Sequence, residues 1–163
     1  MITIVEADIN ELPGVSLSTF NGVVSGFAAV NTVANMNSLV DTLHTLLSKD
    51  GRVIIHGLNQ TGSTQKSLVG FENKPEITTR MIRIGDVEVP HFLMKPALLY
   101  KNYFSDRFEL INVYGMGRCY TFYENPRYPG WMKKGLIRFE SLVFRKQTLI
   151  REGRFFIMEM KKK

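Results

Sequence analysis

The 163-residue sequence predicts an α/β fold, and three features support it. Within 20–27 the apolar residues Val23 and Val24 are consecutive, as are those at 53–55, and this pattern favours strands covered on both faces. An amphipathic stretch lies between these two segments and favours a helix. The turns that join the three segments are short. A strand, a helix and a second strand in this order form a right-handed parallel crossover unit.

The elements of this unit follow in order. Ile2, Ile4 and Val5 form a short β-prone segment before a Pro-Gly turn, and a second strand spans 20–27. The helix is expected over 37–47, with Asn37 as its N-cap and Gly51 as the left-handed residue at its end. Its apolar stripe is Leu39, Val40, Leu43, Leu46 and Leu47. His44 is expected on the exposed side of the helix.

The pattern changes after residue 59. A polar loop at 60–66 precedes alternating residues at 78–94, which predict a β-hairpin that turns at Gly85-Asp86. We interpret 60–95 as a loop and hairpin insert over the active-site face. The later expected elements are a short helix opened by Pro96, a strand at 108–114, a loop at 115–135, a helix at 136–146, a strand at 154–160 and a solvated lysine tail.

Charge and aromatic residues divide the chain at the same point. Residues 1–59 hold two basic and five acidic residues, a net charge of −3, and two aromatic residues. Residues 60–163 hold nineteen basic and ten acidic residues, a net charge of +9, and sixteen aromatic residues. Such asymmetry indicates a scaffold followed by a cover and recognition surface.

Composition argues against several classes of protein. No apolar run approaches the ~20 residues that span a bilayer, and the first residues resemble no secretory leader, so we expect a cytoplasmic protein that binds no membrane. Cys119 is the single cysteine, which excludes an internal disulfide or a cysteine metal cluster. The histidines have no metal-site spacing, so no metal is predicted.

The order of these segments resembles the class I S-adenosylmethionine-dependent methyltransferases of the small-molecule type. The matching segments are GVVSGFAAVNTV, LLSKDGRVIIHGLN, YFSDRFELINVYGMGR and EGRFFIMEM. The resemblance implies a Rossmann-like, mostly parallel sheet with an antiparallel pair of strands at its C-terminal end. It also implies S-adenosylmethionine as cofactor and a small-molecule substrate, with one domain over 1–163.

The resemblance assigns a cofactor role to residues at two strand ends. Asp8 matches the acidic residue that accepts a hydrogen bond from the adenine amine, and Ile9 matches an apolar wall of the adenine. Ser25, Gly26 and Phe27 match the loop under the methionine portion and the transferring methyl group. Ligands in such folds bind beyond the carboxyl ends of the parallel strands, which agrees with these positions.

The sequence departs from the family at its start. It enters the family pattern at the third strand, and no glycine-rich loop or ribose-binding acidic residue precedes that strand. We therefore expect an N-terminally truncated domain that binds the cofactor weakly or not at all alone. Unpaired sheet edges should also favour a homo-oligomer.

His56 is the candidate catalytic base, because it lies near the carboxyl end of a strand, although a structural role fits as well. Arg118, Tyr120 and Tyr123 are candidate substrate contacts, or they simply pack. Three functions follow. The first is methyl transfer to a small molecule, the second is an inactive methyltransferase-like module that binds a partner, and the third is a basic nucleic-acid-binding domain. The spread of the basic residues makes nucleic acid the weakest of the three.

Overall fold

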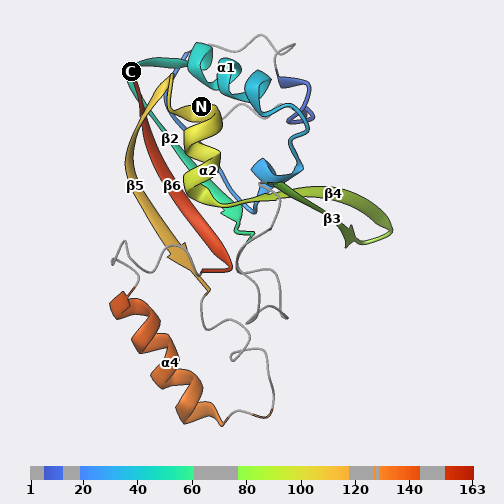
Figure 1. Ribbon diagram of the computed structural model, residues 1–163, viewed down its shortest axis with the longest axis vertical. Helices are drawn as coiled ribbons and strands as arrows, with labels where there is room; N and C mark the ends of the chain where they lie inside the picture. The colour runs from blue at the N-terminus through green and yellow to red at the C-terminus, as the bar shows by residue number, and fades with distance from the viewer. Residues whose placement is uncertain (1–5, 13–18, 61–76, 118–126, 128, 144–152) are drawn as a thin grey trace.

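A four-stranded sheet forms the centre of the computed structural model, which describes residues 6–12, 19–60, 77–117, 127, 129–143 and 153–163. Its strand order is β1-β2-β6-β5 (Figure 1). The strands span Phe20–Ser25 (β1), Leu47–Leu58 (β2), Phe108–Met116 (β5) and Phe155–Lys162 (β6). The predicted strand at 2–5 lies outside the described residues.

Strand directions confirm the crossover unit and the C-terminal pair. β1 pairs with β2 in parallel, whereas β6 is antiparallel to both β2 and β5. β1, β2 and β5 therefore run in one direction and β6 runs in the other. The expected mostly parallel sheet is thus only partly correct for the described strands, since β6 lies between β2 and β5 and leaves β1–β2 as the parallel pair.

One face of the sheet packs against the helices and forms the core, and we call it the core face. Val53 and Ile55 of β2 and Met158 and Met160 of β6 are buried on it. They join residues from the crossover helix and from the segment after the hairpin in one apolar cluster. The opposite face, which we call the outer face, leaves Val24 at 74% and Ile54 at 36% exposed. The prediction that both strands are covered on both faces was therefore wrong.

Helix α1 (Met36–Leu46) is the predicted crossover helix, but its ends differ from the prediction. Asn35 caps it instead of Asn37, because the Asn35 side chain accepts a hydrogen bond from the Ser38 backbone N–H. Asp50, with φ 63°, is the left-handed residue instead of Gly51. A Cβ at Gly51 would lie 2.9 Å from the Ser48 carbonyl oxygen, so close approach, and not a positive φ, requires glycine there.

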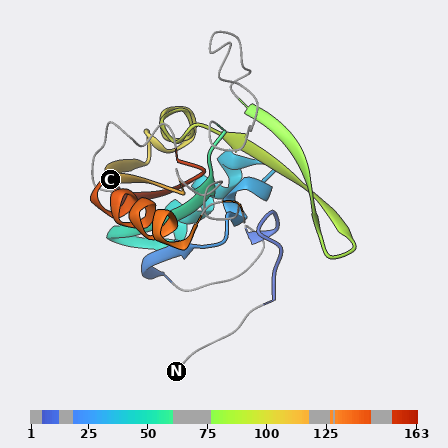
Figure 2. The same ribbon diagram turned by 90° about the horizontal axis from the view of Figure 1, so that it is seen from below.

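The hairpin forms as predicted, from β3 (Ile77–Ile84) and β4 (Val87–Met94). Its tip projects away from the sheet, and its base returns to the core (Figure 2). A short 3-10 turn, η2 (Ala29–Thr32), links β1 to α1. Pro96 opens α2 (Pro96–Leu99), which continues as a π-helical turn, η3 (Tyr100–Phe104).

Three further expectations need correction. Helix α4 (Gly130–Val143) begins inside the segment predicted as a loop, and lies beyond the end of the sheet in Figure 1. His44 is half-buried, with its ring edge-on to Phe108 at 6.0 Å between centroids. The Lys162 ammonium donates to the carbonyl oxygens of His44 and Leu47, at 2.6 and 2.8 Å. It therefore caps α1 and is not simply solvated.

Candidate functional site

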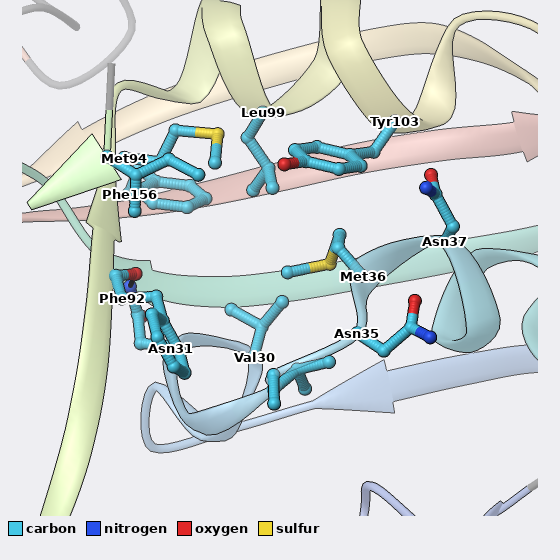
Figure 3. A pocket seen from close by; sticks show the side chains of 13 residues that line it. Val30, Asn31, Asn35, Met36, Asn37, Phe92, Met94, Leu99, Tyr103 and Phe156 are labelled. Atoms are coloured by element: carbon cyan, nitrogen blue, oxygen red, sulfur yellow. Dashed lines mark hydrogen bonds between the residues drawn. The ribbon is translucent and has the colours of Figure 1, made fainter. Parts of the chain in front are cut away.

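A cavity of about 340 Å³ lies on the core face, between the start of α1, the base of the hairpin and the α2–η3 helix (Figure 3). Exposed residues, among them Asn35 and Asn37, lie at its rim on the side of α1. Buried Met94, Leu99 and Phe156 form its interior. The lining residues are Val30, Asn31, Val33, Ala34, Asn35, Met36, Asn37, Ile77, Phe92, Met94, Leu99, Tyr103 and Phe156.

Asn31 holds the two sides of the cavity together. Its side-chain amide donates to the carbonyl oxygens of Leu58 and Phe92, at 3.2 and 2.9 Å, and its Oδ1 accepts from the Leu58 N–H at 2.7 Å. One buried side chain therefore joins η2 to the end of β2 and to β4. Sequence reasoning missed this residue, although a polar side chain within the apolar run AAVNTV was the available signal.

Gly57 allows the cavity wall to close against β2. A Cβ at this position would lie 2.5 Å from the Phe156 ring and 3.2 Å from the Asn31 Oδ1. Any side chain would displace both residues, because the contact with the ring is shorter than real carbon contacts allow. Glycine at 57 therefore sets the position of the Phe156 ring beneath the cavity.

The predicted cofactor loop, Ser25 to Phe27, lies one short turn from this cavity, because η2 follows it directly. The Ser25 Oγ is buried and has no hydrogen-bond partner among the described residues. Gly26 faces open space where a Cβ would lie. Phe27 and Ala28 both have a positive φ, 51° and 60°, and Phe27 is 100% exposed. Left-handed residues other than glycine are strained, and such strain gathers at functional sites.

Asp8 lies in an exposed turn that is tied to the same region. Its Oδ1 accepts from the backbone N–H of Asn10 at 2.7 Å and from the Asn10 side-chain amide at 3.0 Å. These two hydrogen bonds, the backbone one first, lower the pKa of Asp8 below its usual value. The Asn10 Oδ1 in turn accepts from the N–H of Ala34, which lines the cavity. Ile9 is half-buried and packs against the core.

His56, the candidate base, lies on the outer face, opposite the cavity. It alternates along β2 with Ile55 and Gly57, which belong to the core face, and its ring stacks on Phe155 at 5.5 Å between centroids. Burial lowers the pKa of His56 below its ordinary value of 6.5. The imidazole and the cavity wall are therefore on different sides of the sheet. The catalytic role of His56 stays a prediction.

The structure does not place the other predicted substrate residues. Arg118, Tyr120 and Tyr123 lie outside the described residues. Among the residues that are described, no three His, Cys, Asp or Glu side chains are grouped so that they could hold a metal ion. In the same part of the chain, no helix is both long enough and apolar enough to cross a membrane.

Comparison with known proteins gives matches in structure alone. No family model and no curated protein matches this sequence. The glycopeptide N-methyltransferase MtfA, solved with S-adenosyl-L-homocysteine, aligns with 99% of this chain at a TM-score of 0.57 and 12% identity. A protein from Listeria monocytogenes assigned as an S-adenosylmethionine-dependent methyltransferase aligns with 93% at a TM-score of 0.55 and 11% identity. An S-adenosylmethionine-dependent methyltransferase from Clostridium acetobutylicum aligns with 92% of this chain at a TM-score of 0.50 and 10% identity.

These similarities show the fold. At 10–12% identity they carry no residue roles to this chain. The chain covers 61% of MtfA, 66% of the Listeria protein and 61% of the Clostridium protein, so it spans less than two thirds of each. The chain therefore has the fold of class I S-adenosylmethionine-dependent methyltransferases over the part of those proteins that it matches.

Proposed function

We propose that this chain is most of a methyltransferase domain that transfers a methyl group from S-adenosylmethionine to a small molecule. The observation that carries the proposal is the loop at Ser25 to Phe27 beside the cavity. It combines a buried hydroxyl that has no hydrogen-bond partner among the described residues, open space at Gly26, and a strained backbone at Phe27 that continues into Ala28. The fold shared with methyltransferases supports this interpretation, because ligands in such sheets bind beyond the carboxyl ends of the parallel strands.

The residues at this edge fit part of the cofactor. The Ser25 hydroxyl could donate to a polar group of the methionine portion, and the exposed Phe27 ring could cover it. The Asp8 Oδ1 is occupied by Asn10, while its Oδ2 accepts no hydrogen bond from the described residues and could accept one from the adenine amine. Ile9 offers an apolar surface beside it. The cofactor, when bound, supplies an activated methyl group on a sulfonium centre.

The cavity on the core face is our candidate site for the methyl acceptor. Methyl transfer from a sulfonium needs chiefly alignment of the nucleophile and exclusion of water. Buried Met94, Leu99 and Phe156 give the cavity interior apolar walls, which offer water no hydrogen bonds. Asn31 fixes the hairpin base to the end of β2, so it positions the wall of the cavity. The predicted substrate contacts Arg118, Tyr120 and Tyr123 remain part of this proposal.

The described strands would correspond to the last four strands of the family sheet. This sequence holds no match to the family's glycine-rich loop or to its ribose-binding carboxylate. Each buried polar anchor contributes about 1–3 kcal/mol, so we propose that this chain alone binds the cofactor orders of magnitude more weakly than a complete site. Its sheet edges would favour a homo-oligomer, which light scattering after gel filtration measures.

The experiment that tests the function is a calorimetric titration with S-adenosylhomocysteine. It compares this chain with a fusion that adds the strands of MtfA which this chain does not match. We expect little heat from the chain alone and clear binding by the fusion. In the fusion, Ser25→Ala and Asp8→Ala should each weaken binding. Ser48→Ala is the control and should not weaken it. Ser48 lies at the start of β2, which is the end of the β1–β2 pair away from Ser25.

The stability of the Ser25→Ala variant separates binding from folding. A buried hydroxyl without a partner destabilises a fold, so its removal should leave the melting temperature unchanged or raise it. Weaker cofactor binding in a variant of equal or higher stability would support a binding role. A cooperatively folded fusion that binds no S-adenosylhomocysteine would overturn the proposed function.

A further inference from the structure

We propose that the cavity binds the methyl acceptor through an uncharged, ring-bearing part of that molecule. This inference rests on the proposed function and adds the substrate class. It is carried by three observations on the cavity wall, which are its lack of charge, its aromatic and thioether groups, and the amides at one end.

Among the residues that the structure describes, the cavity wall holds no charged side chain. The chain has 21 basic and 15 acidic residues, and all thirteen lining residues are uncharged. A carboxylate or an ammonium group that entered the cavity would lose its water without gaining an ion pair there. The cost of such a transfer is large for an unpaired charge, so the cavity selects against charged groups.

The shape and softness of the wall favour a ring. Phe92 and Phe156 present aromatic rings, and Met36 and Met94 present flexible thioethers (Figure 3). Aromatic and sulfur contacts both favour the faces and edges of planar rings. A volume of about 340 Å³ lies near the lower end of the ~300–1,000 Å³ range of ligand pockets, so the bound part is small.

The polar groups of the wall suit a hydroxyl or an amide on that ring. Asn31 is not available, because both of its donors and its oxygen are already bonded within the protein. The Asn35 oxygen caps α1 at the Ser38 N–H, which leaves its amide N–H groups without a bond to any described residue. Asn35 and Asn37 lie together at the α1 end of the cavity in Figure 3, with Tyr103 on the facing helix.

The test measures binding of three small probes to the full chain, and it does not need turnover. Benzyl alcohol, benzoate and benzylammonium share one ring and differ in charge. Carbon-13-labelled methionine methyl groups report the site, because Met36 and Met94 line the cavity while Met81 is on the projecting hairpin. We expect benzyl alcohol to shift Met36 and Met94 but not Met81, and both charged probes to bind at least about tenfold more weakly.

A charge placed at the cavity should reverse this preference. Met36→Glu puts a carboxylate on the wall at the first turn of α1, where the helix dipole favours an acidic residue and supports folding. The substitution should weaken the binding of benzyl alcohol and strengthen the binding of benzylammonium, each by about tenfold. Ser38→Glu, two residues on and outside the cavity lining, is the matched control and should change neither probe.

The outcomes separate this inference from the proposed function. The inference is overturned if the wild-type chain binds the charged probes as tightly as benzyl alcohol, or if benzyl alcohol does not shift Met36 and Met94. Both outcomes are read from the wild-type chain, so they do not depend on whether the variants fold. Displacement of benzyl alcohol by S-adenosylhomocysteine also overturns it, since the cavity would then belong to the cofactor. If the probes behave as expected but the fusion with the MtfA strands binds no S-adenosylhomocysteine, the proposed function alone fails.

Discussion

The two faces of the central sheet differ in packing and in what they offer a ligand. The core face buries Val53, Ile55 and Phe156 almost completely and carries the cavity. The outer face leaves Ile54 at 36% exposed and Val24 at 74% exposed, and it carries His56. Neighbours along one strand therefore have opposite surroundings, because side chains alternate between the faces of a sheet.

Two adjacent residues near the end of β2 show this difference. His56 and Gly57 are adjacent and both lie near the carboxyl end of β2, yet only Gly57 adjoins the cavity wall. The nearness of a residue to the end of a strand does not decide which side of the sheet it serves. The register with β6, in which His56 is opposite Ile157 and Gly57 is opposite Phe156, gives the assignment.

The largest expected effect compares adjacent isoleucines on the two faces. Ile55→Ala should lower the free energy of unfolding by about 2–5 kcal/mol, because it removes a side chain that is 1% exposed and leaves a cavity. Ile54→Ala, on the outer face, should cost less than about 1 kcal/mol. Denaturant unfolding of both variants measures the difference. Equal costs would mean that the outer face is covered as well as the core face.

The next effect concerns the close contact beneath the cavity. Gly57→Ala should lower the free energy of unfolding by about 1–3 kcal/mol, because its methyl group would overlap the Phe156 ring. Gly22→Ala on β1 is the control, since a Cβ there meets only the Arg52 carbonyl oxygen at 3.5 Å. The control should stay within about 0.5 kcal/mol of the wild type. If both variants were equally stable, the position of the Phe156 ring would be wrong.

The smallest effect is on the outer face and depends on pH. Burial lowers the pKa of His56 in the folded chain, so the unfolded chain binds a proton more readily. Above pH 6.5 the residue is neutral in both states and contributes no pH dependence. As the pH falls through 6.5, stability should fall until the pH reaches the lower, folded pKa. Thermal melts between pH 7.5 and about 5 should therefore show a smaller loss in His56→Gln than in the wild type.

His44 gives that experiment an internal reference. Burial, with Lys162 and Arg107 nearby, also lowers the pKa of His44, so part of the acid loss should remain in His56→Gln. If the melting temperature of His56→Gln fell with pH as much as that of the wild type, the imidazole would be as well solvated in the folded chain as in the unfolded one.

Much of the fold was predictable from local patterns. The apolar stripe of α1, the alternation around Gly85-Asp86 and the two last strands gave the crossover unit, the hairpin and the antiparallel pair correctly. The consecutive apolar residues at 23–24 and 53–55 gave the strands but not their burial, because composition along a strand does not reveal whether another layer covers it. The start of α4 at Gly130 was missed because Pro126, Pro129 and Gly130 favour a loop there.

The site was less predictable than the fold. Asn31, Phe92 and Phe156 come together from η2, the hairpin and the last strand, and no local pattern in the sequence joins them. Ser25 to Phe27 were chosen by resemblance, and the structure adds the buried hydroxyl and the strained backbone that a sequence cannot display. The role of these residues and of Asp8, Ile9 and His56 stays a prediction until binding is measured.

The central claim is that the transferable methyl group lies on the side of the sheet that carries the cavity. The most direct test is a transferred nuclear Overhauser measurement with S-adenosylmethionine labelled with carbon-13 at its methyl group, which suits weak binding by the chain alone. We predict contacts from that methyl group to Phe27 and Val30, at the loop and the cavity wall. Contacts to His56 and Phe155 alone, on the outer face, would contradict the account.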